Sequence, residues 1–301
     1  MQVLILGNSQ DAHAARVEQE LSVKGIAAHY LDTNLFPTSC SISWQPDLGE
    51  GYLHLSTGDK LAFKDVKSVY WRNLASISIP NLGDATLQRT AYNDSMSLLR
   101  TLIQALPARW VNSWAAYQFH KDKPLQLRLA SKLGVTIPAT LISNNPELIQ
   151  QFATRQPKLI FKPVTGGVHT QWVTKSLLET ERLKKVLSLS PVTLQEYIPG
   201  TNIRTYVIGE SVYSAEIATS ALDFRSDKDA KLTPVELPHA VREQSIAIAS
   251  SFSLKWTGID WRRKPTGEYV FLEANPSPMF IYFENQTGFP IARELVNLLI
   301  N

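Results

Sequence analysis

Tyr269-Val-Phe-Leu-Glu273-Ala-Asn275-Pro276 is the most informative segment of this sequence. Strand alternation places Glu273 and Asn275 on one face of a predicted strand. Asp260 lies on the preceding predicted strand, and a turn at Pro265-Thr266-Gly267 brings it near the same end of the hairpin. Two carboxylates and an amide supply the hard oxygen donors that suit Mg²⁺ bridging phosphates. A solvated hairpin face with charges at its end fits the same residues.

A lysine beside a glycine turn forms a second candidate site. Lys158-Leu-Ile-Phe-Lys162 is a predicted strand, and Gly166 and Gly167 follow it closely. Glycine allows close backbone approach and lysine supplies a point charge, so this combination suits a phosphate group. The sequence contains no GxxxxGK[ST] P-loop. The alternative is a strand end with a solvent-reaching lysine.

A third candidate site follows another predicted strand. Leu194-Gln195-Glu196-Tyr197-Ile198-Pro-Gly200 leads from this strand into a loop that reaches Asn202 and Arg204. Backbone groups at such a strand end can bind the edge of an adenine, an acceptor further on can reach a ribose, and an arginine can face phosphate. A strand, a turn and an edge arginine would look the same.

The composition of the 301-residue chain restricts its class. Its net charge of +3 is too small to indicate a nucleic-acid footprint. Hydrophobic residues make up 44% and charged residues 19%, which excludes a disordered chain. No apolar run has the length of a membrane span, and the start MQVLILGNSQD predicts a strand rather than a signal peptide. A single cysteine, Cys40, leaves no intramolecular disulfide, so we expect a reducing, cytoplasmic setting.

Hydrophobic periodicity predicts a mixed α/β (α+β) chain. The first segment has the pattern of a βαβ unit without a GxGxxG dinucleotide motif, and three short alternating segments between residues 42 and 63 predict antiparallel hairpins. A long polar connection is expected over residues 219–238. Helices are predicted over residues 11–24, 84–106, 122–134, from 146, 177–188, 239–253 and from 290.

The order of the candidate residues resembles one superfamily. Lys123, Lys162, Gln195–Ile198, Arg204, Asp260 and Glu273-x-Asn275-Pro276 occur in the sequence order of the ATP-grasp superfamily, and the resemblance covers essentially the whole chain. Within it, the chain is most similar to the branch of the ribosomal-protein glutamate ligases and the microviridin-type peptide-maturing (graspetide) ligases. The segments that carry the latter likeness are residues 31–37, 69–72, 126–130, 142–146, 223–225, 271–276 and 287–291.

This resemblance implies an ATP-grasp fold in three parts. These are a pre-grasp α/β domain over residues 1–110, a central subdomain over 111–190 and a C-terminal subdomain with the metal site over 191–301. ATP would be held between the last two. The implied enzyme is an ATP-dependent ligase that converts a carboxylate to an acyl phosphate and transfers it to an amine or hydroxyl, releasing ADP and phosphate. The carboxylate belongs to an amino acid, a small metabolite or a peptide.

The resemblance also implies roles for individual residues. Arg204 would face the γ-phosphate or the acyl phosphate. Arg225, in Asp223-Phe-Arg225, is a further candidate that the family likeness favours, with a surface arginine as the alternative. Asn202 stands where the family commonly has an acidic ribose ligand. The implied ATP ligands are Lys123, Lys162, Gly166, Gly167, Gln195, Glu196, Tyr197 and Ile198, and the implied ligands of one or two Mg²⁺ (or Mn²⁺) ions are Asp260, Glu273 and Asn275.

Arg72 comes from the residues rather than from the motif. It follows Trp71 at the end of a predicted strand, where an arginine fork suits a substrate carboxylate. A surface arginine stacked on the tryptophan is the alternative.

Other functions stay open at this point. An ATP-grasp kinase for a small-molecule hydroxyl, or a non-catalytic ATP-binding protein, would share the core motifs. Local sequence favours a peptide substrate, whereas the short segment between Lys162 and Gln195 favours a smaller carboxylate. Neither a nucleic acid nor a membrane is an expected partner, and a homodimer is possible.

Overall fold

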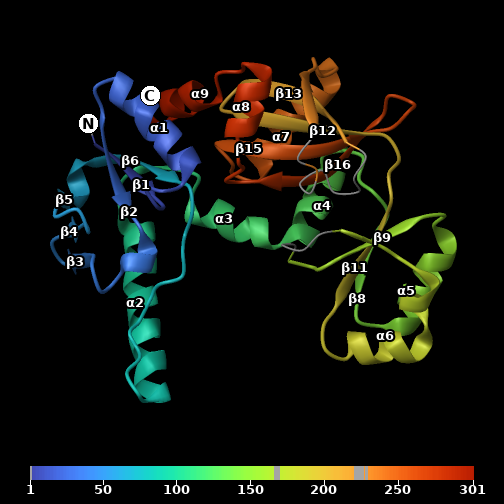
Figure 1. The fold of residues 1–301 in the computed structure, drawn as a ribbon, viewed down its shortest axis with the longest axis horizontal. Helices are drawn as coiled ribbons and strands as arrows, with labels where there is room; N and C mark the ends of the chain where they lie inside the picture. The colour runs from blue at the N-terminus through green and yellow to red at the C-terminus, as the bar shows by residue number, and fades with distance from the viewer. Residues whose placement is uncertain (1, 166–169, 220–226, 228–229) are drawn as a thin grey trace. The chain divides into compact units, whose positions relative to one another are not determined.

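The computed structural model describes residues 2–165, 170–219, 227 and 230–301. It divides into two compact units. Unit 1 comprises Met1–Ala115, Leu254–Trp256 and Ser277–Asn301, and unit 2 comprises Ala116–Ser253 and Thr257–Pro276. Both contain helices and strands (Figure 1), as the mixed α/β prediction requires.

Unit 1 is built on a parallel sheet with the strand order β2-β1-β6-β7. Every neighbouring pair in it is parallel, and β1 and β6 are almost entirely buried. Burial on both faces explains the apolar runs Val3–Leu6 in β1 and Val69–Trp71 in β6. The strands are β1 (Gln2–Leu6), β2 (Ala27–Leu31), β6 (Val66–Trp71) and β7 (Arg109–Val111).

The predicted hairpins form a separate three-stranded antiparallel sheet in unit 1. Its strands β3 (Ser41–Gln45), β4 (Glu50–His54) and β5 (Lys60–Ala62) follow one another in the order β3-β4-β5. The short 3₁₀ turns η1 (Thr33–Leu35) and η2 (Phe63–Asp65) flank it. Alternation between buried and exposed residues along β4 confirms the period-two pattern.

Two helices of unit 1, α1 and α2, begin at aspartates whose side chains cap them. Asp11 accepts a hydrogen bond from the Ala14 N–H, and Asp84 accepts from two backbone N–H groups, which satisfies otherwise unpaired donors. Figure 1 shows α1 and α9 close together, and they pack on each other. The helices are α1 (Ala12–Val23), α2 (Ala85–Ala105), α8 (Ile281–Thr287) and α9 (Ile291–Ile300).

Helix α8 was not predicted from the sequence, and its cap explains why. The Nδ1 atom of His13, on α1, accepts hydrogen bonds from the N–H groups of Phe280 (3.2 Å) and Ile281 (3.4 Å). The cap therefore comes from a residue far away in the sequence, which no local signal reveals. Burial, together with the charge of Arg72, lowers the pKa of His13 to about 4.

We expect His13 to make the protein less stable in acid. Because its pKa is lower in the folded state than the usual 6.5, the unfolded chain takes up a proton first as the pH falls from about 6.5 to about 4. The free energy of unfolding should fall over this window, by about 1–2 kcal/mol from this residue because its partial exposure to solvent weakens the effect. Denaturant unfolding at pH 7 and pH 4.5 measures the loss. His13→Gln, which keeps an acceptor, should lose less, and an equal loss would contradict the assignment.

Unit 2 contains a first sheet with the strand order β10-β9-β11-β8. Helices α5 and α6 supply the side chains that cover it, in a core of Ile149, Leu159, Leu183, Leu187, Val192 and Leu194. The predicted helix over 177–188 is a 3₁₀ turn followed by a shorter helix. The elements are β8 (Thr140–Ser143), α5 (Pro146–Arg155), β9 (Leu159–Lys162), β10 (Gln171–Trp172), η3 (Lys175–Leu178), α6 (Thr180–Leu187) and β11 (Val192–Glu196).

A five-stranded antiparallel sheet of order β14-β13-β12-β15-β16 completes unit 2. The expected polar connection over residues 219–238 was partly wrong, because β14 (Lys231–Pro234) pairs with β13 there. A short polar edge strand that ends in proline gives little hydrophobic signal. The other elements, of which α3 and β15 begin with residues of unit 1, are α3 (Trp114–Lys121), α4 (Lys123–Lys132), β12 (Thr201–Ile208), β13 (Ser211–Ala218), α7 (His239–Ser251), β15 (Trp256–Arg263) and β16 (Tyr269–Asn275).

In the described part of the chain, no helix is both long and apolar enough to cross a membrane.

Candidate functional site

Two carboxylates face each other across the β15–β16 hairpin. Asp260 pairs with Glu273, whereas the next residue, Trp261, pairs with Phe271. Leu272 is therefore an extra residue on β16, that is, a β-bulge. Without it, Asp260 would pair with Leu272. The bulge thus aligns the two carboxylates, as bulges beside functional sites often do.

Three cationic side chains surround this carboxylate pair. Lys123, at the start of α4, forms an ion pair with Glu273. The Nε of Arg204 lies 3.0 Å from Oδ1 of Asp260. Burial opposes ionisation of Glu273, but the charge and hydrogen bond of Lys123, helped by Lys162 and Arg204, lower its pKa below the ordinary value. The structure thus brings together five residues predicted from the sequence.

Lys162 is oriented by a buried glutamine. Its Nζ donates a hydrogen bond to Oε1 of Gln195 (3.0 Å), and Nε2 of Gln195 donates to the hydroxyl of Thr140 (3.0 Å). The Gln195 side chain is only 3% exposed. A predicted ATP ligand is thus engaged within the protein, where it directs the Lys162 ammonium group.

The segment from Glu196 to Asn202 connects the two sheets of unit 2. Oε2 of Glu196 accepts a hydrogen bond from the Ala139 N–H (3.1 Å), so this carboxylate ties β11 to the chain before β8. The Tyr197 ring lies 4.7 Å from that of Trp172, centre to centre, and Nζ of Lys158 lies 4.3 Å from the Trp172 ring centre. Cation–π contacts of this kind stiffen the start of the connection.

Arg262, a residue that the sequence analysis missed, holds this connection in three places. Its guanidinium donates to the Ile198 carbonyl (3.0 Å), to Oδ1 of Asn202 (2.8 Å) and to the Tyr197 hydroxyl (3.4 Å). Burial lowers the pKa of Arg262 from its ordinary value. Its position two residues after Asp260 was the available signal, because strand alternation places both on one face.

A glycine lets the same connection pass close to β15. Gly200 has φ +128°, and a Cβ there would overlap the carbonyl oxygen of Arg263. Residues with a side chain rarely adopt this backbone conformation. Both the close contact and the backbone torsion therefore favour glycine at this position.

The remaining predicted residues divide into two groups. Arg72 lies in unit 1, where its Nε donates to Oδ1 of Asp11 (3.0 Å) and its Nη1 to the carbonyl and hydroxyl of Ser277 (3.2 Å each). Gly166, Gly167 and Arg225 lie outside the described residues. The Asn275 carbonyl accepts a hydrogen bond from the Thr257 hydroxyl (2.8 Å).

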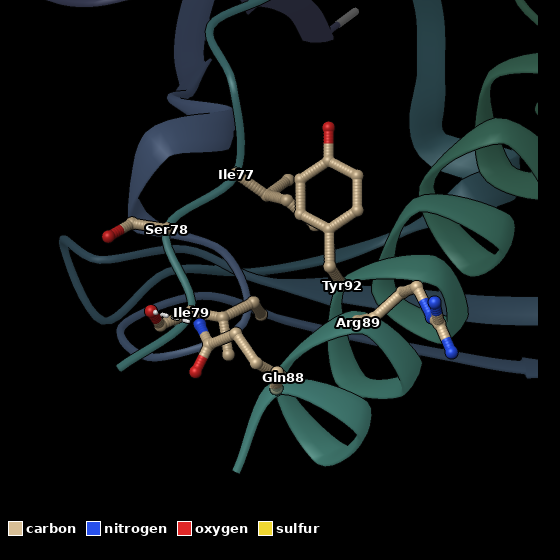
Figure 2. Close-up of a pocket in the computed structure, with 7 residues that line it drawn as sticks. Ile77, Ser78, Ile79, Gln88, Arg89 and Tyr92 are labelled. Atoms are coloured by element: carbon tan, nitrogen blue, oxygen red, sulfur yellow. Dashed lines mark hydrogen bonds between the residues drawn. The ribbon is translucent and has the colours of Figure 1, made fainter. Parts of the chain in front are cut away.

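Two surface hollows are lined by residues other than the carboxylate pair and its cationic neighbours. The one in unit 1 has a volume of about 510 Å³, and Figure 2 shows Ile77, Ser78 and Ile79 on one side of it and residues of α2 on the other. Nε2 of Gln88 donates to the Ile79 carbonyl there. The hollow in unit 2 has about 310 Å³ and is lined in part by Lys158 and Trp172. Neither is lined by an acidic residue.

The donor set at the hairpin fits a magnesium–nucleotide complex. Among the described residues, no three His, Cys, Asp or Glu side chains gather as a metal site, so a metal here would use the two carboxylates and the Asn275 amide. Mg²⁺ is commonly held by one or two carboxylates together with substrate phosphates. Lys123, Lys162 and Arg204 supply the positive charge that such phosphates need.

Comparison with known families agrees with this geometry. The family model described as the RimK-like ATP-grasp domain matches residues 120–299, and the MvdD pre-ATP-grasp domain matches residues 2–118. The chain belongs to the RimK-like ATP-grasp family, and the predicted superfamily and fold are confirmed.

Named relatives and solved structures are ligases. A probable alpha-L-glutamate ligase 2 from Shewanella amazonensis is 29% identical over 60% of this chain and 63% of its own length. The chain thus spans less than two thirds of this relative. A ribosomal protein bS6–L-glutamate ligase from Salmonella paratyphi B is 29% identical over 72% of this chain and 74% of its own.

Two solved structures match over nearly the whole chain. The macrocyclase MdnC from Microcystis aeruginosa MRC, bound with the precursor peptide MdnA, has a TM-score of 0.89 at 28% identity and covers 100% of both chains. The ATP-grasp ligase PsnB, complexed with a minimal precursor, Mg and ADP, has a TM-score of 0.84 at 27% identity, covering 99% of this chain and 96% of its own. The predicted branch of ligases is therefore confirmed.

Proposed function

We propose that this chain is an ATP-dependent ligase that joins a carboxylate to an amine, or to a hydroxyl, through an acyl phosphate. The observation that carries the proposal is the Asp260–Glu273 pair with Lys123, Lys162 and Arg204 around it. Phosphoryl transfer needs positioning and charge neutralisation more than covalent catalysis, and this cluster offers both.

The cluster suggests a role for each side chain. Asp260, Glu273 and Asn275 would hold Mg²⁺, with Mn²⁺ as an alternative ion. When bound, this metal supplies a Lewis acid that neutralises charge on the transferred phosphoryl group. Lys123 and Lys162 would leave their present partners to bind the α- and β-phosphates, and Arg204 would bind the γ-phosphate or the acyl phosphate.

The connection after β11 would bind the adenosine. Backbone groups of Glu196, Tyr197 and Ile198 would contact the adenine, and Gln195 would act through Lys162, to which it is hydrogen bonded. Asn202 would present its amide to the ribose, since Arg262 already engages its Oδ1. Gly166 and Gly167, which lie outside the described residues, would be further ligands of the phosphates.

We propose a peptide carboxylate as the substrate. The similarity to MdnC and PsnB, solved with precursor peptides and extending along nearly the whole chain, supports this choice over a small metabolite. Arg225 and Arg72 are the candidate ligands of the acyl group; Arg72 would have to release Ser277 for this role. We also propose that domain boundaries lie near residues 110 and 190. A homodimer and a cytoplasmic location complete the proposal.

Trapping with hydroxylamine tests the proposal. The pure protein is incubated with ATP, Mg²⁺, hydroxylamine and pools of candidate carboxylates, including acidic peptides and free amino acids, and the products are read by mass spectrometry. Because hydroxylamine captures acyl phosphates, we expect a hydroxamate of one peptide together with ADP.

Other products would point elsewhere. If the products are ADP and a phosphorylated hydroxyl, with no hydroxamate, the protein is a kinase and not a ligase. A hydroxamate of a free amino acid would keep the ligase and overturn the peptide substrate. Nucleotide binding without any product from these pools would favour a non-catalytic ATP-binding protein.

A further inference from the structure

The edge of strand β16 is completed by a side chain rather than by another strand. β16 is the last strand of its sheet, so backbone groups on its outer edge need other partners. The Phe271 N–H donates to the Thr136 carbonyl (2.9 Å). Because the bulge at Leu272 shifts the alternation by one residue, Ala274 is the next to present its backbone groups to this edge.

Gln126 satisfies both of these Ala274 groups. Its Oε1 accepts a hydrogen bond from the Ala274 N–H (3.0 Å), and its Nε2 donates to the Ala274 carbonyl (3.1 Å). The side-chain amide thus takes the place of a peptide group in a neighbouring strand. Gln126 is 1% exposed, so few competing water molecules can reach these bonds.

One helix face joins this contact to the carboxylate pair. Lys123 and Gln126 are three residues apart on α4, so they lie on the same face. Lys123 pairs with Glu273, and Gln126 binds the residue next to it. Nδ1 of His120 also lies 3.0 Å from the Ala274 carbonyl oxygen and 3.2 Å from Nε2 of Gln126, so this ring packs against the same contact.

We infer that Gln126 is a positioning residue for the magnesium site, an inference that rests on the proposed function. Ala274 stands between Glu273 and Asn275, two of the proposed metal ligands. Fixing its N–H and carbonyl fixes the strand on either side, and with it the direction of both ligand side chains. Residues behind metal ligands commonly tune metal affinity or activity about 10–100-fold.

The test compares Gln126→Met with the matched variant Gln150→Met. Methionine keeps the length and apolar volume of the side chain but forms neither bond. Gln150 is also a helical glutamine of unit 2 whose Nε2 donates to the Leu178 carbonyl (3.0 Å) and the Thr180 hydroxyl (3.1 Å). Gln126→Glu, which keeps only the acceptor for Ala274, is the second variant if the methionine variant does not fold.

Two measurements test the inference without requiring catalytic turnover. Hydrogen exchange of the Ala274 amide reports the strand edge, and electron paramagnetic resonance of Mn²⁺ titrated in the presence of ADP reports metal binding. We expect Gln126→Met to speed exchange and raise the Mn²⁺ dissociation constant by about 10–100-fold. Gln126→Glu, which places an acceptor against the Ala274 carbonyl where the amide donated, should shift both in the same direction, and Gln150→Met should change neither.

Two outcomes would overturn the inference in distinguishable ways. If Glu273→Gln binds Mn²⁺ like the wild type, the proposed metal site itself is wrong, and the inference is overturned with it. If Glu273→Gln loses Mn²⁺ while Gln126→Met binds it as Gln150→Met does, the metal site stands and Gln126 only stabilises the fold.

Discussion

Glu273→Gln is expected to lower the rate of ATP-dependent ADP release by about 10²–10³-fold or more. The amide keeps the shape of the side chain but removes the negative charge that faces Lys123 and stands opposite Asp260. Removing one preorganised electrostatic contact commonly costs a factor of this size. Steady-state kinetics with the trapped substrate, or with hydroxylamine as acceptor, measures the change.

A charge on the same hairpin provides the matched control. Glu268 pairs with Lys264 (2.8 Å) near the turn of the β15–β16 hairpin and is exposed. Glu268→Gln removes the same charge from the same hairpin, yet should leave the rate within about two-fold, because exposed ion pairs contribute little. Near-normal turnover of Glu273→Gln would show that the metal assignment is wrong.

Gly200→Ala is expected to raise the KM for ATP at least about ten-fold and to lower the melting temperature. The new Cβ would overlap the Arg263 carbonyl oxygen, and the backbone torsion of Gly200 is one that alanine rarely adopts. Such strain costs about 1–3 kcal/mol before the overlap is counted. Relief requires the chain between Ile198 and Asn202 to move away from β15, which would disturb its bonds to Arg262.

The control for this prediction is a glycine that also has a positive φ but has open surroundings. Gly267 has φ +88° in the turn of the β15–β16 hairpin, and a Cβ there meets no atom within 4 Å. Gly267→Ala should therefore lose stability through torsion alone and keep the wild-type KM for ATP. If Gly200→Ala has the same KM for ATP as the wild type, the segment from Glu196 to Asn202 does not contribute to nucleotide binding.

Local patterns predicted most of the elements that have local causes. Asp11, Asp84 and Asn145 each cap a helix within the next few residues, so those helices could be predicted from their first turns. The hairpins between residues 42 and 63 followed from alternation over short distances. Helix α8 and strand β14 escaped, because the cap of the first comes from His13 and the pairing of the second from β13.

The candidate site divides in the same way. The identities and order of these five residues could be recognised from residue chemistry and from their likeness to the family order, because each carries a charged group that suits phosphate or metal binding. They are Lys123, Lys162, Arg204, Asp260 and Glu273. The side chains to which these residues are hydrogen bonded could not be predicted from the sequence. The Lys162–Gln195 bond could not be predicted, since it joins side chains of two strands whose register depends on the whole sheet.

Sequence thus established the superfamily, the mixed α/β class and the residues with charge and metal chemistry, since these depend on residue type and spacing along the chain. The alignment of Asp260 with Glu273, the clamping of Ala274 by Gln126 and the hold of Arg262 on Asn202 appeared only in three dimensions. A single-residue bulge reverses which side chains share a face of a strand. Each of these contacts therefore depends on register and packing, which are set by the assembled sheets and helices together.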